Sequence, residues 1–250
     1  MIDRALNYGR QNVADYLRDS LPFQTVLDLG AGHGDDLGTA RSLSPRASLH
    51  GVEVFVPYQE ELASTGIVVH ELDLEHDRLP FLDEQVDVII ANQILEHTKE
   101  VFWILHEISR VLRLGGSFIV GIPNLAALHN RLLLLCGFQP TPLKNASAHV
   151  RGYTRRDFRS LLDSGFESGY RLRSWSGSNF YPFPPGPAKR LATLFPSMAW
   201  GLFMRLTKED VYAGGYLRYP VDAQLETNFW SGERRVTANP TSSAHERHRE

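Results

Sequence analysis

The sequence predicts one α/β domain built on a doubly wound, mostly parallel sheet with helices on both faces. Two observations support this fold class. Five short apolar runs recur with segments of helical or loop character between them, and a glycine-rich turn directly follows the first run. The runs are nearly continuous rather than alternating in polarity, which is typical of parallel strands buried on both faces. They cover residues 25–29, 49–54, 67–72, 86–91 and 117–122.

Helical periodicity predicts the elements before the first strand and after the fourth. Residues 1–22 place apolar side chains at roughly helical spacing until Pro22, so a helix should precede the sheet. Residues 99–114 carry one apolar stripe, with Thr98 placed to cap the start of a helix and Gly115 and Gly116 placed to end it. We expect this helix to connect the fourth and fifth strands.

The second half of the chain adds two helices and two strands. Thr154 begins a sequence resembling a capping box, and the helix that it opens should stop at Gly165, before a strand over residues 166–174. A proline inside a helix costs about 3 kcal/mol. Pro196 therefore predicts a short helix that ends near Phe195, followed by a strand over residues 199–207. The same proline disfavours the alternative for residues 187–208, a helix lying on a membrane surface.

Length and composition bound the domain organisation and the location. With 250 residues, 42% of them hydrophobic, the chain can build one substantial core. We expect a main domain over residues 1–208, an ordered extension over residues 209–231 and a disordered polar tail over residues 232–250. The net charge of −3 gives no general attraction to nucleic acid, and the single Cys136 excludes an intramolecular disulfide. The first residues lack the apolar core of a signal peptide, so the expected location is the cytoplasm.

The turn after the first strand, VLDLGAGHGDD, indicates a site for a small ligand. Its alternating glycines let a ligand approach the main chain, and N–H groups at the start of the next helix can donate hydrogen bonds. The dinucleotide fingerprint would need a further glycine where Asp35 stands, which argues against a nicotinamide-dependent reductase. Asp28, Asp35 and Asp36 favour a ligand that carries positive charge. The glycines of the turn are Gly30, Gly32 and Gly34.

Two more carboxylates follow the next two strands. Glu53 ends the second predicted strand, where a carboxylate typically holds ribose hydroxyls. Asp73 follows the third strand, in position to accept a hydrogen bond from the exocyclic amine of adenine. A cationic nucleoside with an amino acid end matches all of these positions. S-adenosylmethionine is that molecule, and it is the predicted cofactor.

In order along the chain, these stretches resemble the successive motifs of class I S-adenosylmethionine-dependent methyltransferases. The stretches are VLDLGAGHGD, GVEVF, LDLE, VDVIIANQILEH and LRLGGSFIVGIPN, within residues 20–125. The resemblance implies a Rossmann-like, seven-stranded sheet with the last strand antiparallel. It also implies a set of cofactor contacts: Asp28 at the amino group, Gly30, Ala31, Gly32 and Gly34 at the methionine part, Glu53 and Val54 at the ribose, Asp73 and Leu74 at adenine, and Asn92 near the methionine end.

Two histidines are candidates for the catalytic base. Methyl transfer is an in-line displacement, so the protein mainly positions the nucleophile and removes its proton where the nucleophile is a hydroxyl. His97, in NQILEHTKE, follows the fourth strand, and His149 lies in SAHVRGYTRRDF. Alternatively, His97 serves only in helix capping or packing, and His149 is a loop histidine that is hydrogen-bonded to the main chain.

A metal site is not expected beside these histidines. NQILEHTKE is similar to the corresponding stretch of ubiquinone-pathway O-methyltransferases, in which two glutamates and a histidine hold a divalent ion. In this sequence the positions are Gln93, Glu96 and His97. Because a glutamine in place of the first carboxylate weakens a site for a hard cation, we predict no metal.

The predicted reaction is O-methylation of a small molecule, a sugar or a lipid-linked biosynthetic intermediate. The His149 stretch is similar to one in bacterial methyltransferases associated with glycans and with lipid-linked or quinone-like acceptors. Nucleic acid is not expected as a partner, and contact with a membrane surface is not favoured. The competing function is a non-catalytic, S-adenosylmethionine-binding partner in a biosynthetic complex.

Two segments keep alternative roles. The leucines of residues 125–135 either roof an acceptor pocket or pack a helix on the sheet. The aromatic extension, residues 209–231, lies either over the active site or in a subunit contact. The leucines concerned are Leu125, Leu128, Leu132 and Leu135.

Overall fold

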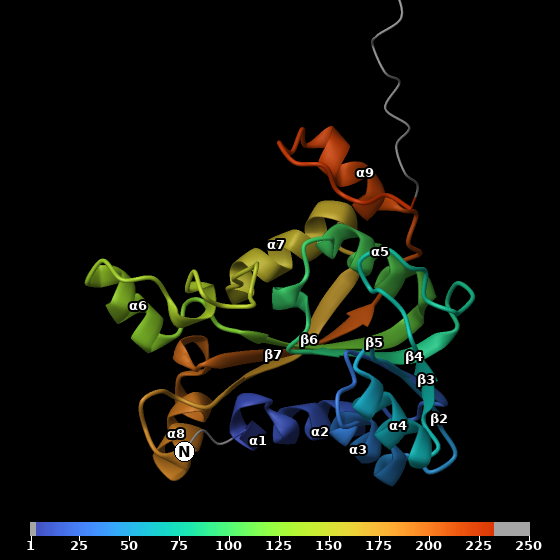
Figure 1. The fold of residues 1–250 in the computed structure, drawn as a ribbon, viewed down its shortest axis with the longest axis horizontal. Coiled ribbons are helices and arrows are strands. Elements are labelled where there is room, and N and C mark those ends of the chain that lie inside the picture. Colours follow the sequence, from blue (N-terminus) through green and yellow to red (C-terminus); the bar gives the residue numbers. More distant parts are fainter. Residues whose placement is uncertain (1–3, 233–250) are drawn as a thin grey trace, which may run out of the picture.

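A computed structural model describes residues 4–232 of the chain, and its centre is a sheet of seven strands (Figure 1). The strands lie in the order β3-β2-β1-β4-β5-β7-β6. The first five run parallel, and β7 runs antiparallel between β5 and β6. The predicted fold class, with its antiparallel last strand, is therefore confirmed. The strands are β1 (Thr25–Leu29), β2 (Ser48–Val52), β3 (Val68–His70), β4 (Val86–Asn92), β5 (Leu112–Pro123), β6 (Tyr170–Ser178) and β7 (Gly201–Lys208).

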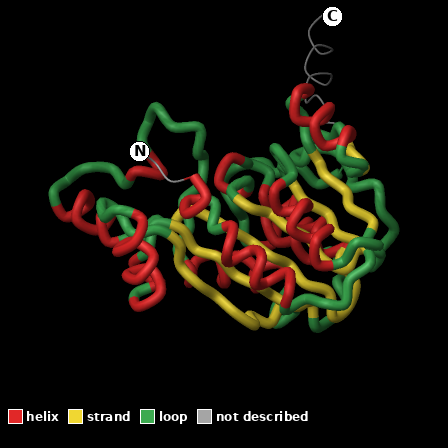
Figure 2. The backbone as a smooth tube through the Cα atoms, turned by 90° about the horizontal axis from the view of Figure 1, so that it is seen from below, coloured by secondary structure: helices red, strands yellow, loops and turns green. Residues whose placement is uncertain are grey.

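Helices cover both faces of this sheet, and each face has its own apolar core (Figures 1 and 2). One face carries α1 (Arg4–Asn7), α2 (Arg10–Arg18), α3 (Asp35–Leu43) and α4 (Val56–Ser64); the other carries α5 (Val101–Val111), α7 (Arg155–Gly165) and α9 (Gly215–Asp222). Neighbouring side chains of β1 alternate between the two cores: Val26 packs with Leu37 on the first face, and Leu27 packs with Ile108 on the second. This alternation explains the continuous apolar run of a buried parallel strand.

The connection between β4 and β5 differs from the sequence prediction. Helix α5 is shorter than residues 99–114, and Glu100 rather than Thr98 occupies its N-cap position. The Thr98 hydroxyl instead donates a hydrogen bond to the carbonyl of Leu95. Strand β5 already begins at Leu112, which pairs with Val86, so the two glycines expected to end the helix lie inside the strand. Sheet pairing therefore determines the boundary here.

Three other boundaries can be compared with the prediction. Gly9, at φ 53°, separates the leading helix into α1 and α2. The Thr154 side chain accepts a hydrogen bond from the Asp157 amide, which confirms the predicted start of α7. Strand β6 begins at Tyr170 rather than at residue 166, because a turn closed by the Gly169 amide and the Phe166 carbonyl intervenes. Helix α8 (Pro185–Leu194) and β7 follow as predicted.

The α6 helix (Leu128–Leu135) does not pack on the sheet, so that prediction is wrong. It extends from the body of the molecule at one end (Figure 1). Leu128 packs against a small cluster with Phe180 and α8, whereas Leu135 is 83% exposed. The apolar pattern of this helix is therefore not explained by burial.

The extension after β7 packs on the outer helices. Tyr212 and Tyr216 contact the apolar core beneath α5 and α7, and the Glu100 side chain accepts a hydrogen bond from the Trp230 amide. None of the described residues of this extension lines the large cavity described below. The tail expected over residues 232–250 lies outside the described part, apart from Gly232. Within residues 4–232, no helix has the length and apolarity needed to span a bilayer.

Candidate active site

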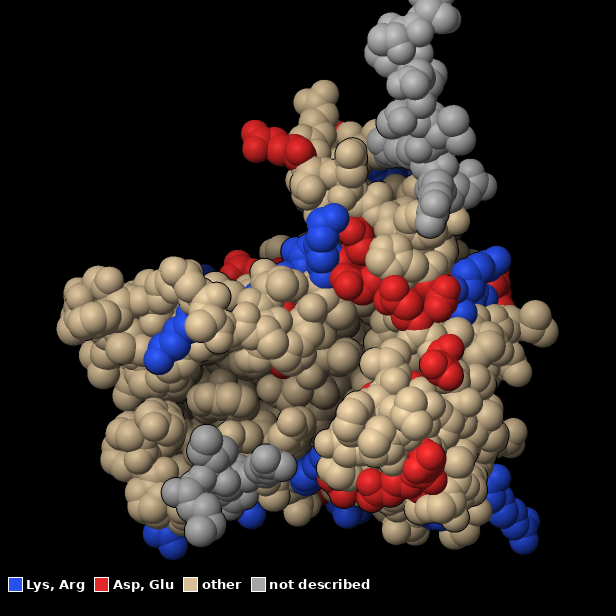
Figure 3. All heavy atoms as spheres, in the orientation of Figure 1, with Lys and Arg blue, Asp and Glu red and all other residues tan. Residues whose placement is uncertain are grey.

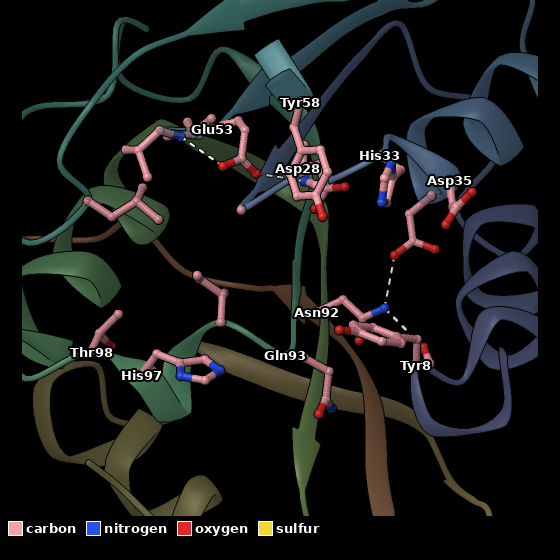
Figure 4. A pocket seen from close by; sticks show the side chains of 18 of the residues that line it. Tyr8, Asp28, His33, Asp35, Glu53, Tyr58, Asn92, Gln93, His97 and Thr98 are labelled. Atoms are coloured by element: carbon pink, nitrogen blue, oxygen red, sulfur yellow. Dashed lines mark hydrogen bonds between the residues drawn. The ribbon is translucent and has the colours of Figure 1, made fainter. Parts of the chain in front are cut away.

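A cavity of about 1000 Å³ opens at the carboxyl edge of the parallel strands. Figure 4 shows that the loops after β1, β2 and β4 surround it, with Asp28 and Glu53 opposite His97 and Thr98. Ligands bind at this edge in open α/β sheets. Ten of the residues predicted from the sequence line the cavity: Asp28, Gly30, Ala31, Gly32, Glu53, Val54, Asp73, Leu74, Asn92 and His97. Gly34 and His149 do not line it.

The three glycines of the turn have different roles. All have positive φ, at 70° for Gly30, 53° for Gly32 and 77° for Gly34. A Cβ on Gly34 would lie 2.5 Å from the Leu62 side chain, so this glycine allows close packing of α4. A Cβ on Gly32 would meet no atom within 4 Å, and Gly32 lines the cavity. Gly32 therefore presents bare backbone to a ligand.

Backbone amides hold Glu53 in place. One carboxylate oxygen accepts a hydrogen bond of 2.8 Å from the Gly32 amide, and the other accepts from the amides of Val54 and Phe55 at 2.9 Å. Glu53 thus joins the loop after β1 to the loop after β2. Three N–H groups fix the orientation of this carboxylate, and the oxygen that accepts from Gly32 has a further lone pair for a ligand hydroxyl.

Asp28 is buried at the end of β1, and its side chain is 3% exposed. Burial, with the nearby carboxylates of Asp36 and Glu53, raises the pKa of the Asp28 carboxyl well above its ordinary value, and Arg10 opposes that rise. Among the described residues, no group donates a hydrogen bond to this carboxyl. A cationic ligand group in the cavity would therefore supply a counter-charge.

Arg10 balances the two acids at the start of α3. Its guanidinium lies 2.8 Å from a carboxylate oxygen of Asp35 and 2.8 Å from one of Asp36. The sequence suggested that these acids favour a cationic ligand directly. That interpretation of Asp35 and Asp36 needs correction, because a cation from the protein, Arg10, is bound to both.

Asn92 ends β4 and connects three parts of the site. Its amide nitrogen donates to the Asp36 carboxylate at 2.9 Å and to the carbonyl of Tyr8 at 3.0 Å (Figure 4). Its buried oxygen has no hydrogen-bond partner among the described residues and lies close to Gly121. Asn92 thereby holds the turn after α1 over the cavity.

Polar side chains after β4 are buried without partners. Gln93 adopts a left-handed backbone at φ 59°, and its side-chain nitrogen has no hydrogen-bond partner in the described part of the chain. Both carboxyl oxygens of Glu96 also lack one, and that residue is only 1% exposed. Burial raises the pKa of Glu96 to about 8. Strained backbone and unpartnered buried polar groups are typical of functional sites.

The two predicted base residues come together beside Glu96. The rings of His97 and His149 pack edge to face with centroids 4.6 Å apart. The Nδ1 atoms contact carbonyl oxygens, of Ala148 for His97 and of Pro142 for His149. Since a carbonyl only accepts, each Nδ1 carries the proton, and each Nε2 is left as an acceptor in the neutral ring. Burial, together with His97, lowers the pKa of His149.

The same three residues are the one group in the described part of the chain that offers a set of ligands for a metal ion. Ligand atoms of Glu96, His97 and His149 lie within 4.8 Å of one another. The set considered from the sequence was Gln93, Glu96 and His97, so His149 takes the place of Gln93 in the folded chain. The third member was missed because 52 residues separate His149 from His97 in the chain and only folding joins them.

Asp73 lies at the cavity rim, and its carboxyl group already has local partners. It accepts a hydrogen bond from the Glu75 amide and contacts the His76 ring at 2.8 Å, and these contacts lower its pKa. Sequence reasoning missed several lining residues outside the motifs, among them Tyr8, Arg10 and Tyr58. No local signal marks them, because α1, α2 and α4 reach the cavity only through tertiary packing.

Comparison with known proteins finds a family match over the part of the chain that builds most of this site. Residues 27–120 match a family described as "Methyltransferase domain". A curated relative from Rhodopirellula baltica, "Bifunctional methionine biosynthesis protein MetXA/MetW", is 34% identical over 134 residues, which is 50% of this chain and 20% of that protein. A second, from Mycolicibacterium smegmatis, "Probable S-adenosylmethionine-dependent methyltransferase", is 29% identical over 147 residues, or 57% and 51% of the two chains. The chain thus spans half or less of the length of these relatives.

Solved structures show the same fold at low sequence identity. A Burkholderia thailandensis 1,6-didemethyltoxoflavin-N1-methyltransferase with bound S-adenosylhomocysteine has a TM-score of 0.56 and 16% identity, covering 82% of this chain and 80% of that one. An S-adenosylmethionine-dependent methyltransferase from Mesorhizobium loti has a TM-score of 0.53 and 17% identity, covering 78% and 96%.

The sheet order, the cavity at its carboxyl edge and the matched domain agree with one another. The chain therefore carries a methyltransferase domain over residues 27–120, and its fold is that of S-adenosylmethionine-dependent methyltransferases of known structure. These likenesses agree with S-adenosylmethionine as the cofactor that the sequence predicted.

Proposed function

We propose that this protein uses S-adenosylmethionine to methylate an oxygen of a small molecule, a sugar or a lipid-linked intermediate. The observation that carries the proposal is the contrast within one cavity. The cofactor half presents bare backbone at Gly32 and the fixed carboxylate of Glu53. The acceptor half is lined by His97 after β4, and the buried Glu96 and His149 lie beside that histidine without lining the cavity. A cavity of about 1000 Å³ has room for a cofactor and an acceptor together.

The residues of the cofactor half fit the chemistry of the proposed cofactor. Glu53 would accept hydrogen bonds from the ribose hydroxyls, while Gly32 would allow the methionine part to approach the backbone. Asp28 would face the cationic amino group, and Asp73 with Leu74 would frame adenine. When bound, the cofactor supplies an electrophilic methyl group.

The acceptor half would remove a proton. As the acceptor oxygen forms a bond to the methyl carbon, the carbon–sulfur bond breaks, and the hydroxyl proton passes to a ring nitrogen. His97 lines the cavity, so its Nε2 atom is the proposed proton acceptor. His149 would be the second base or would orient His97 through the ring contact.

Incubation with a methyl-labelled cofactor tests the proposal. The purified protein would receive an extract of small metabolites and glycolipids, and mass spectrometry would identify any compound that gains the label. We expect a labelled methyl ether, absent with a His97→Ala variant. Label on nitrogen or carbon would contradict O-methylation. Cofactor binding with no labelled product would instead favour the competing function, a non-catalytic binding partner.

A further inference from the structure

One end of the molecule exposes apolar side chains on well-formed helices. We call it the apolar end; it comprises Leu132, Leu134, Leu135, Phe138, Leu194 and Phe195, each at least half exposed. Helices α6 and α8 carry these residues and project from the same end of the sheet in Figure 1. Monomeric soluble proteins rarely expose such groups of large apolar side chains without a binding function.

The exposed part of α6 is rigidly built. At its C-terminal end, the Phe138 amide donates to the Leu133 carbonyl and the Gly137 amide donates to the Leu134 carbonyl. Gly137 has φ 78°, so this is a Schellman-type end that holds Phe138 beside the last helical turn. At the other end of the helix, His129 contacts the ring of Tyr181, and Leu128 packs against the α8 cluster. The fold thus holds the apolar side chains in place in solvent.

Charge around the apolar end has one sign. The chain has 29 acidic residues, yet residues 108–156 and 168–208 contain none. These two segments supply α6 and α8. On the one face drawn in Figure 3, basic side chains are visible at this end, while the acidic side chains gather mainly over the middle and right of the molecule. Four basic residues near the apolar end form no ion pair with any described residue: Arg131, Lys144, Lys189 and Arg190.

We propose that the apolar end docks on an anionic lipid bilayer. Exposed leucine and phenylalanine side chains beside unpaired basic residues match the chemistry of an anionic lipid surface, where apolar groups enter the acyl boundary and cations meet phosphates. A protein partner would not require two long segments free of acidic residues. The lack of acidic residues in these two segments fits a lipid partner, because a carboxylate there would be repelled by the lipid phosphates.

The apolar end is continuous with the acceptor half of the site. Helix α6 follows β5 at the carboxyl edge of the sheet, and the loop after α6 carries His149. The same loop is fixed to the site, since the amides of Val150 and Arg151 donate to the Glu96 carbonyl. Docking would therefore bring the acceptor half close to the bilayer. Resting on the proposed function, this geometry favours the lipid-linked acceptor among the three classes named above.

Flotation with lipid vesicles tests the docking without cofactor or acceptor, so its outcome is separate from the test of methyl transfer. The full chain would be mixed with phosphatidylcholine vesicles, with or without about one-third phosphatidylglycerol. We expect binding to the anionic vesicles and weaker binding to the neutral ones. A Leu135→Asp/Phe138→Asp variant should lose at least tenfold in affinity. A Lys189→Gln/Arg190→Gln variant should bind roughly 25-fold more weakly, because each basic residue contributes about fivefold.

The matched control is Leu82→Asp. Leu82 is 77% exposed but lies just before β4, at the opposite edge of the sheet from α6. All of the substituted side chains are exposed, and circular dichroism would check that each variant is folded. Failure of the unmodified chain to bind anionic vesicles would overturn the proposal, as would an equal loss from Leu82→Asp. Light scattering that revealed a dimer broken by Leu135→Asp/Phe138→Asp would assign the apolar end to a second copy instead and would also overturn it.

Discussion

The two halves of the cavity treat their carboxylates differently. In the cofactor half, Glu53 accepts three backbone hydrogen bonds, and Asp35 and Asp36 are paired with Arg10. Beside the acceptor half, Glu96 is buried and has no hydrogen-bond partner among the described residues, and its pKa is raised to about 8. These three acids of the cofactor half are therefore held by donors or by a cation, whereas burial of Glu96 favours its protonated form.

This difference matches the proposed division of work. Binding a cofactor of constant charge benefits from groups that are held in place before the ligand arrives. Moving a proton requires groups whose protonation changes near neutral pH. Asp28 is an intermediate case, because it lies in the cofactor half but its pKa is raised by burial and by neighbouring acids. A cationic ligand group beside Asp28 would bring that pKa down.

The largest expected effect is on turnover. Replacing His97 by alanine should lower kcat by roughly 10²–10³-fold, the usual contribution of a general base. Cofactor affinity should stay within about twofold, since no proposed cofactor contact is removed. Steady-state kinetics and calorimetry on the same preparation would separate the two effects. An unchanged kcat in both His97→Ala and His149→Ala would refute the proposal that these histidines act as bases.

The next effect should appear in cofactor affinity alone. Glu53→Ala removes the ribose acceptor and frees the Gly32 amide, so the dissociation constant should rise by about 100-fold. Calorimetric titration with S-adenosylhomocysteine measures this change. Glu60→Ala is the matched control, because Glu60 lies on α4 but is exposed and outside the cavity. Similar affinities for the two variants would contradict the assigned role of Glu53.

The acceptor half should make stability depend on pH. The folded-state pKa of Glu96 is about 8 and its ordinary value is 4.5. Below pH 4.5 both states hold the proton; as pH rises toward 8 and beyond, only the folded state resists losing it. Glu96 should therefore lower the stability progressively, by on the order of 5 kcal/mol at pH 9. Glu96→Gln should remove this part of the decline, as urea unfolding at pH 5 and pH 9 would reveal. Parallel declines in both proteins would refute the assignment.

The smallest expected effect is that of a chelator. If His97 and His149 act as bases, removal of divalent ions should change kcat by less than about twofold. Activity measured before and after dialysis against a chelator would decide this. A large loss that Mn²⁺ or Zn²⁺ restores would show that Glu96, His97 and His149 hold a metal, and the acceptor half would then work as a metal site.

More of the cofactor half than of the acceptor half could be predicted from the sequence, and the reason is physical. The β1 turn and Glu53 act through backbone geometry and strand order, which local patterns encode. The burial of Glu96 and its contact with His149 depend on a loop that returns after α6, which no local pattern encodes. The ion pairs of Arg10 with Asp35 and Asp36 were also missed, because only tertiary packing brings α2 against the start of α3. Packing on the sheet was one of two roles expected for the α6 leucines, and it is wrong because helical periodicity indicates amphipathicity but not what the apolar side contacts.

The most direct test of the account is calorimetric titration of the protein and of a Gly32→Leu variant with S-adenosylhomocysteine. A Cβ at Gly32 would meet no atom within 4 Å, and Gly32 lines the cavity. Because φ of 53° strains any side chain at this position, Gly32→Ala serves as the control for strain without bulk. We predict that the natural chain binds one equivalent and that Gly32→Leu, checked to be folded, does not bind measurably. No binding by the natural chain, or equal binding by the variant, would contradict the claim that this cavity receives the cofactor against bare backbone.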